Sequence, residues 1–127
     1  MGASGFVAVG VGGALGCWLR WFLVLRLNAQ WPVMPLGTLA ANLIGGFFVG
    51  VAVAFFNRYP GLTPEYRQFV VVGFMGGLTT FSSFSAEVVT MIAKEDYLWA
   101  LGTASVHLLG SLVLTGVGMY CVKLVMG

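Results

Sequence analysis

Apolar residues dominate four long stretches of the chain, and short polar breaks separate them. The stretches cover residues 4–27, 35–56, 66–93 and 97–125. A helix needs about 20 mostly apolar residues to cross a bilayer, and each stretch is long enough. The pattern therefore predicts an all-α integral membrane fold with four transmembrane helices.

Turn and helix-start signals mark the ends of these stretches. Asn28–Pro35 ends the first stretch and Asn57–Gly61 ends the second. Thr63 followed by Pro64 is typical of a helix start, because proline is favoured at the first helical position. Lys94–Asp96 is a short polar turn before the last stretch. No stretch is left over for a water-soluble domain, so we expect residues 1–127 to form a single four-helix transmembrane domain.

The composition supports this class. The 127 residues are 59% hydrophobic and 8% charged, whereas soluble domains carry roughly 25% charged residues. The net charge of +2 is small and no basic cluster occurs, so no nucleic-acid partner is expected. No motif for nucleophilic, zinc or phosphate chemistry is found, and we predict that the protein is not an enzyme. Cys17 and Cys121 lie in apolar stretches without metal-ligand spacing, which predicts buried, unreactive thiols.

The basic residues are balanced between the two sides of the membrane. Four crossings put the N-terminus, the second loop and the C-terminus on one side. The two sets are Arg58, Arg67 and Lys123 against Arg20, Arg26 and Lys94. Orientation normally follows an excess of basic residues on one side. Two interpretations remain open: one orientation fixed by other factors, or dual topology, in which the chain inserts both ways.

Small residues spaced four apart favour assembly. Gly12/Gly16, Gly46/Gly50 and Gly73/Gly77 are pairs of this kind, and such pairs let helix backbones approach closely. Four short helices do not easily enclose a polar path, so a homodimer is the simplest arrangement. Under dual topology the dimer would be antiparallel, with its two-fold axis in the membrane plane.

The segment Gly73–Ser85 interrupts its own apolar surroundings with glycines and hydroxyl residues. Gly76 and Gly77 weaken a helix, since glycine is roughly 1 kcal/mol worse than alanine there. We predict a break of the third helix at mid-membrane, where non-helical backbone must be buried or line a cavity. Freed carbonyls would suit a hard cation, and the new helix N-terminus would favour an anion. A simple kink without an ion is the alternative.

Polar residues in the first two stretches each allow two interpretations. Arg20 lies inside the first stretch, where a charge is costly and indicates function. Either it extends to the nearer interface, or it lines a water-filled vestibule that attracts an anion. Asn42 lies one helical turn after Thr38, on the same face. Its amide either joins helices or donates to an anion.

The third and fourth stretches carry further candidates. Hydroxyl residues follow the glycines at Thr79, Ser82, Ser83 and Ser85. Phe81 and Phe84 share one helix face, where they either pack or turn their electropositive ring edges toward an anion. Glu87 is expected to face water or a polar partner. In the last stretch a polar stripe is formed by Thr103, His107, Ser111 and Thr115; His107 makes either an interhelical hydrogen bond or a proton relay.

Four motifs resemble those of one family. Gly76–Glu87 resembles the signature of the bacterial Fluc (CrcB) fluoride channels. Gly12–Arg20, Pro35–Asn42 and His107–Ser111 are similar to the family's first, second and fourth helix motifs. The resemblance covers nearly the whole chain. It implies a multi-pass protein of the bacterial inner membrane that exports cytoplasmic fluoride passively and thereby reduces fluoride toxicity.

The resemblance also implies an assembly and a set of site residues. The family forms dual-topology antiparallel homodimers with two pores, so the partners would be fluoride, the lipid bilayer and a second copy of the chain. Backbone carbonyls of Gly76 and Thr79 would hold a structural Na⁺ that is not transported. The fluoride pathway would comprise Asn42, Phe81, Phe84, Ser82, Ser83, Ser111 and Thr38, with Arg20 and Glu87 in the vestibule. The phenylalanine edges would face fluoride, and Asn42 would orient the rings and contact the ion.

Two rival functions were weighed against a channel. Small dual-topology multidrug antiporters also have four helices per chain, but they need a mid-membrane carboxylate to exchange protons for cations. The carboxylates of this chain lie at or near the ends of the stretches, at Glu65, Glu87, Glu95 and Asp96. A non-transporting assembly subunit is the other rival, and the polar stripes argue against it.

Overall fold

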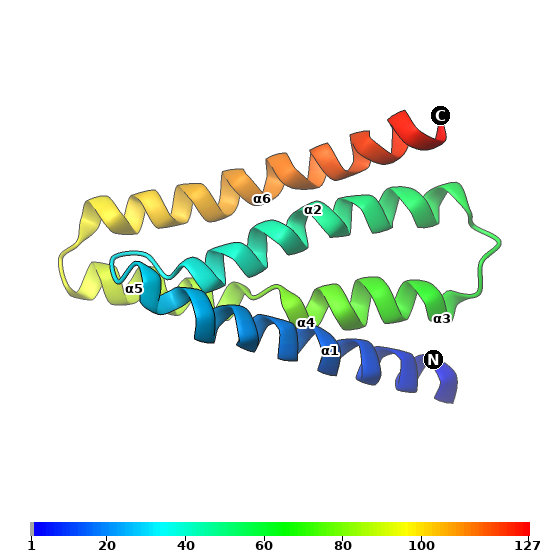
Figure 1. Ribbon diagram of the computed structural model, residues 1–127, viewed down its shortest axis with the longest axis horizontal. Helices are drawn as coiled ribbons and strands as arrows, with labels where there is room; N and C mark the ends of the chain where they lie inside the picture. The colour runs from blue at the N-terminus through cyan, green and yellow to red at the C-terminus, as the bar shows by residue number, and fades with distance from the viewer. Residues whose placement is uncertain (1) are drawn as a thin grey trace.

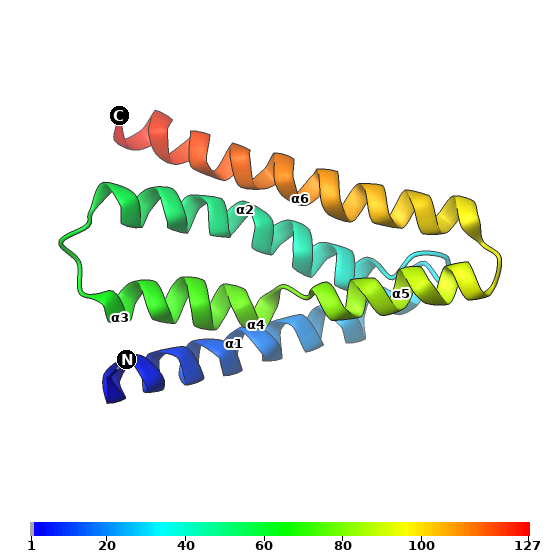
Figure 2. The same ribbon diagram turned by 180° about the vertical axis from the view of Figure 1, so that it is seen from behind.

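A computed structural model describes residues 2–127, and its regular elements are all helical. Four helical segments are long and apolar enough to span a membrane: Ala3–Gln30, Leu36–Arg58, Pro64–Ala93 and Tyr97–Met126. The four predicted transmembrane helices are therefore confirmed, with ends that differ by only a few residues. Both ends of the chain lie at the same end of the bundle, beside the loop between α2 and α3 (Figures 1 and 2).

The third span is divided into several elements, whereas the other spans are nearly continuous. The chain runs through α1 (Ala3–Leu27), the 3₁₀-helix η1 (Asn28–Gln30), α2 (Leu36–Arg58), α3 (Pro64–Arg67), the π-helix η2 (Gln68–Met75), α4 (Gly76–Leu78), α5 (Phe81–Ala93) and α6 (Tyr97–Met126). A π-helical stretch is rare and is found mainly at functional sites.

The helices begin and end near the predicted signals, and the structure also shows a cap on α2 and a left-handed residue after α5. Thr63 is the N-cap residue of α3 and Pro64 is its first residue, although Thr63 makes no side-chain capping bond. The N-terminus of α2 is capped from the preceding loop: the side-chain oxygen of Asn28 accepts the backbone N–H groups of Gly37 and Thr38 at 2.7 and 3.2 Å. After α5, Glu95 takes a left-handed conformation with φ 63°.

The pair α2 and α6 packs backbone against backbone. A Cβ atom on Gly50 would collide with the backbone of Thr115, and one on Gly118 would collide with Phe47 and Val51. The hydroxyl of Thr115 donates to the carbonyl of Gly46 at 2.8 Å and so links the two helices. Small residues, rather than large apolar side chains, therefore set the distance between these spans.

Glycines also bring α1 against the third span. Gly12 faces the backbone of Phe69 and of Phe74, and Gly16 faces Phe74 and Leu78. Gly73 faces α1 in turn. The small-residue pairs that the sequence associated with assembly thus serve contacts within one chain, so they do not themselves support a dimer.

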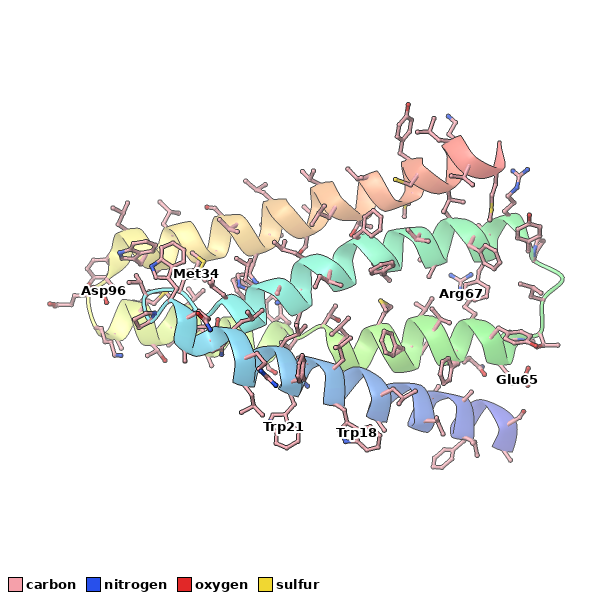
Figure 3. The ribbon with its side chains drawn as sticks, in the orientation of Figure 1. Trp18, Trp21, Met34, Glu65, Arg67 and Asp96 are labelled. Carbon is pink, nitrogen blue, oxygen red and sulfur yellow. The ribbon has the colours of Figure 1, made fainter. Side chains whose placement is uncertain are left out.

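The outer surface of the bundle is apolar. Trp18 and Trp21 are 62% and 64% exposed and point away from the other helices (Figure 3). Such residues are expected to face hydrocarbon in a membrane-spanning chain. Cys17 is exposed on the same helix, so the prediction that it is buried was wrong. A thiol can lie beside lipid because it is only weakly polar.

The two glycines Gly116 and Gly118 test the role of backbone contact. Gly118 touches α2, whereas a Cβ on Gly116 would meet nothing within 4 Å. We expect Gly118→Ala to destabilise the protein by about 1–3 kcal/mol, since overpacking forces helices apart. Gly116→Ala should leave stability equal or slightly higher. Reversible unfolding in detergent measures both; equal stabilities of the two variants would contradict this packing.

Candidate functional site

The backbone leaves the helix within the third span. The helical segment ends at Leu78 and α5 begins at Phe81, while Thr79 (φ −84°, ψ 153°) and Thr80 (φ −149°, ψ 116°) are extended. Gly76 and Gly77 remain helical, so the sequence-based placement of the break at these glycines was wrong. Gly77 instead allows close packing, because a Cβ there would collide with the backbone of α1.

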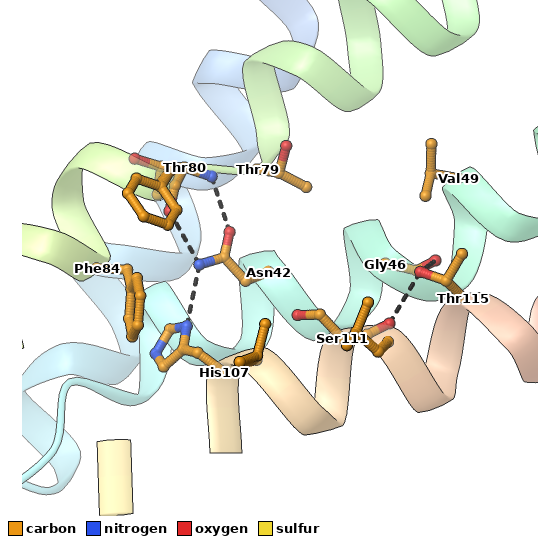
Figure 4. Close-up of a pocket in the computed structure, with 12 residues that line it drawn as sticks. Asn42, Gly46, Val49, Thr79, Thr80, Phe84, His107, Ser111 and Thr115 are labelled. Carbon is orange, nitrogen blue, oxygen red and sulfur yellow. Dashed lines mark hydrogen bonds between the residues drawn. The ribbon is translucent and has the colours of Figure 1, made fainter. Parts of the chain in front are cut away.

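Asn42 on α2 binds both backbone groups of extended Thr80 (Figure 4). The Thr80 N–H donates to Asn42 Oδ1 at 2.7 Å, and Asn42 Nδ2 donates to the Thr80 carbonyl at 3.0 Å. A backbone N–H can only donate and a carbonyl can only accept, so these two bonds fix the orientation of the amide. Asn42 thus binds the Thr80 N–H, which has lost its helical acceptor, and adds a second bond to the carbonyl of the same residue.

The same amide determines the state of His107 on α6. Asn42 Nδ2 lies 3.0 Å from His107 Nδ1. Because Nδ2 is a donor, Nδ1 must accept, and the imidazole is neutral with its proton on Nε2. His107 is 3% exposed and its ring packs on Phe84 with centroids 4.6 Å apart. Of the two interpretations of His107, the structure contains the interhelical hydrogen bond.

Two phenylalanines stand at the start of α5. The rings of Phe81 and Phe84 meet edge to face, with centroids 5.6 Å apart, and Phe81 is 79% exposed. The hydroxyl oxygen of Thr80 caps this helix by accepting the N–H of Ser83 at 3.1 Å. The exposed Ser82 places its hydroxyl 3.4 Å from the same oxygen.

These residues surround an open cavity of about 350 Å³ (Figure 4). Its walls come from α2, the third span and α6, and the lining includes Asn42, Thr79, Phe81, Phe84, His107 and Ser111. The cavity combines aromatic rings with hydroxyl groups, and its lining within residues 2–127 includes His107 but no carboxylate, lysine or arginine. It therefore suits a small solute that is held by many weak contacts rather than by a strong charge.

Two other predicted residues form a separate pair. The hydroxyl of Thr38 donates to Glu87 Oε2 at 2.6 Å, and Thr38 is 1% exposed. Glu87 lines a second cavity of about 580 Å³ together with Lys94 and Asp96. Glu87 thus has the polar partner that the sequence allowed, and it lies outside the lining of the first cavity.

Thr79 and Thr80 form the interruption of the third span. Arg20 contacts its edge from α1, whereas Asn42 contacts it from α2. The Nε of Arg20 donates to the carbonyl of Gly77 at 3.0 Å, and its Nη2 lies 4.0 Å from Cys17 Sγ. The side chain is half-buried. The guanidinium is therefore turned toward the protein instead of extending freely to an interface.

The interruption also releases carbonyl groups. In a continuous helix the N–H groups of Thr80 and Ser83 would bind the carbonyls of Gly76 and Thr79. Here those N–H groups bind Asn42 Oδ1 and Thr80 Oγ1. The carbonyls of Gly76 and Thr79, the two residues predicted to bind a cation, have therefore lost their helical hydrogen-bond donors.

Sequence reasoning gave no role to Thr80. This residue supplies both the backbone bonds to Asn42 and the cap of α5. A signal was available, because threonine is a favoured N-cap residue and its oxygen accepts from the third residue of the helix. The cavity-lining residue Thr115 was noted only as part of the polar stripe.

The sequence was compared with known proteins. A family model described as CrcB-like protein, Camphor Resistance (CrcB), matches residues 7–119. The chain belongs to the CrcB family. A CrcB relative from Cupriavidus metallidurans is 55% identical over 120 residues, which are 94% of this chain and 95% of the relative. One from Thiobacillus denitrificans is 55% identical over 122 residues, 94% of this chain and 97% of the relative.

A third relative, from Pseudomonas putida, is 53% identical over 113 residues, 89% of each chain. All three relatives carry the name "Fluoride-specific ion channel FluC". The family predicted from the four motifs is therefore confirmed. CrcB membership and four apolar spans make the chain a multi-pass membrane protein, consistent with the bacterial inner membrane. The relatives are named as channels rather than enzymes, which agrees with the prediction that this chain is not an enzyme.

Proposed function

We propose that this protein is a fluoride-selective ion channel. It lets cytoplasmic fluoride leave the cell by passive electrodiffusion and thereby reduces fluoride toxicity. The observation that carries the proposal is the near full-length similarity, at about 55% identity, to channels named for fluoride. The aromatic and hydroxyl lining of the cavity supports it, because this lining offers an anion weak, dispersed contacts.

Fluoride is small and strongly hydrated, so the pathway has to replace its water. The edges of Phe81 and Phe84 carry partial positive charge, and the hydroxyls of Ser82, Ser83 and Ser111 provide further donors along or beside the pathway. The hydroxyl of Thr38 already donates to Glu87, so Thr38 acts beside the pathway by holding that carboxylate. Asn42 borders the pathway. Since its two amide protons already bind Thr80 and His107, it acts mainly by holding the backbone and the rings in place. Arg20 and Glu87 belong to the vestibules.

A second copy of the chain is part of the proposal. Phe81 is 79% exposed and Gly76 is exposed in one chain, so unpaired backbone and polar cavity walls would face lipid. Polar backbone at membrane depth is stable only when protein covers it. An antiparallel homodimer, which the balanced charges allow, would bring the two interruptions together at mid-membrane and form two pores.

A structural Na⁺, not transported, fits this arrangement. The carbonyls of Gly76 and Thr79 have lost their helical donors, and unwound carbonyls are the ligands that membrane proteins offer to Na⁺. Two carbonyls from each chain would hold the ion at the dimer centre. The cation would compensate the unpaired carbonyls and join the two subunits.

Fluoride release from liposomes tests the function. Reconstituted protein should release trapped fluoride, followed with an electrode, and should leave chloride inside. The rival class, a proton-coupled antiporter of small cationic drugs, predicts no fluoride release and uptake of a lipophilic cation driven by a pH gradient. That result would reject the channel.

Asn42→Asp tests the pathway. The carboxylate would repel an entering anion and would lose the N–H that binds the Thr80 carbonyl, so we expect fluoride release to fall at least about 100-fold, as for a buried unpaired charge. Asn57→Asp is the matched control, since Asn57 lies near the end of α2 and, within residues 2–127, its side chain accepts a hydrogen bond from Arg67 rather than from the interruption. Unchanged release in a folded, dimeric Asn42→Asp protein would remove Asn42 from the pathway.

Removal of Na⁺ tests the structural cation. Protein purified and reconstituted with N-methylglucamine in place of Na⁺ should lose fluoride release, because that cation is too large for a site made of four carbonyls. Re-addition of Na⁺ should restore release. Full activity with no Na⁺ at any stage would count against the site.

A further inference from the structure

The carbonyls freed by the interruption are not equivalent. A continuous helix would pair the carbonyl of Gly77 with the N–H of Phe81, but Phe81 begins a new helix after the extended residues. The Gly77 carbonyl instead accepts a hydrogen bond from Arg20 Nε at 3.0 Å. Gly76, one residue earlier, has no such side-chain donor among the hydrogen bonds of residues 2–127. One freed carbonyl is thus held by a side chain, while its neighbour is left for another ligand.

The position of Arg20 depends on the glycine contacts between α1 and the third span. Gly16 faces the backbone of Phe74 and Leu78, and Gly77 faces the backbone of Gly13 and Cys17. Because the two backbones touch, an arginine one turn beyond Gly16 lies beside the end of α4. Its Nε, the nitrogen nearest the backbone, is then within reach of the Gly77 carbonyl.

We infer that Arg20 is a positioning residue that fixes the end of α4 and so keeps the interruption at Thr79 and Thr80. It holds the last helical turn from α1, while Asn42 holds the extended Thr80 from α2. The interruption is therefore clamped from two sides by two side chains. This role differs from that of a free vestibule cation, and it rests on the proposed function only for its transport readout.

The charge and the donor of Arg20 can be separated. In glutamine, Nε2 occupies the place along the side chain that Nε has in arginine, so Arg20→Gln keeps a neutral N–H donor. Methionine has a similar length and no donor. A clamp requires the donor, whereas attraction of an anion requires the charge. The clamp therefore predicts that the two variants differ, whereas attraction of an anion predicts that both behave alike because both lack the charge.

Hydrogen exchange of the protein in lipid nanodiscs measures the clamp without fluoride. We expect Arg20→Met to speed exchange of the amides of Thr79, Thr80 and Ser83 about tenfold, as for loss of one hydrogen bond. Arg20→Gln should exchange at nearly the wild-type rate. Arg26→Met is the control, because Arg26 lies over the Phe22 ring and away from the interruption. Exchange in α6 checks that each variant is folded.

Fluoride release should follow the same order, with Arg20→Gln near the wild type and Arg20→Met strongly reduced. Equal exchange in the Gln and Met variants, whether fast or slow, would overturn the clamp. If wild-type protein released no fluoride while the exchange difference persisted, the proposed function would fail and the clamp would stand.

A measurement on the wild type covers the case in which Arg20→Met does not fold. Solid-state NMR with ¹⁵N-labelled arginine and ¹³C-carbonyl-labelled glycine should give a through-space contact between Arg20 Nε and the Gly77 carbonyl. This contact should vanish in Arg20→Met if that protein folds, and its absence from the wild type would overturn the inference.

Discussion

The pairing of Asn42 with Thr80 is the contact on which the site depends. A backbone that leaves the helix inside a membrane loses its hydrogen-bond partners where water cannot replace them. One primary amide has one acceptor and two donors, which is enough to bind both backbone groups of an extended residue and still reach His107. The contact holds Thr80 in its extended conformation, and it also fixes His107, on whose ring Phe84 packs.

Close packing through glycine makes such pairing possible. Asparagine has a short side chain, so α2 has to lie near the interruption, and Arg20 reaches its carbonyl only because α1 touches α4 through Gly16 and Gly77. Where glycines bring two helix backbones into contact, a side-chain donor on one helix can reach a backbone acceptor on the other directly. The glycines therefore contribute to the polar chemistry although they carry no polar side chain.

Much of the architecture could be predicted from the sequence, because hydropathy and segment length are local properties. The four spans, the cap at Thr63 and the polar face that holds Asn42 are of this kind. The position of the interruption was not predictable from glycine content, since Gly76 and Gly77 remain helical and the threonines after them are extended. The position of the interruption depends on contacts from other spans, because Asn42 lies on α2 and Arg20 lies on α1. Fluoride itself came from family resemblance, since no local pattern encodes the identity of an anion.

The ligands of the proposed cation would be main-chain atoms. Side-chain identity at Gly76 or Thr79 therefore affects these oxygens only through the shape of the backbone. A substitution that preserves this shape leaves the oxygens unchanged, whereas a change in α1 or α2 can move them without touching the third span. Variation that alters the proposed site is accordingly expected to accumulate in the neighbouring helices that hold the backbone. Engineering of such a site would have to begin at residues that do not contact the ion.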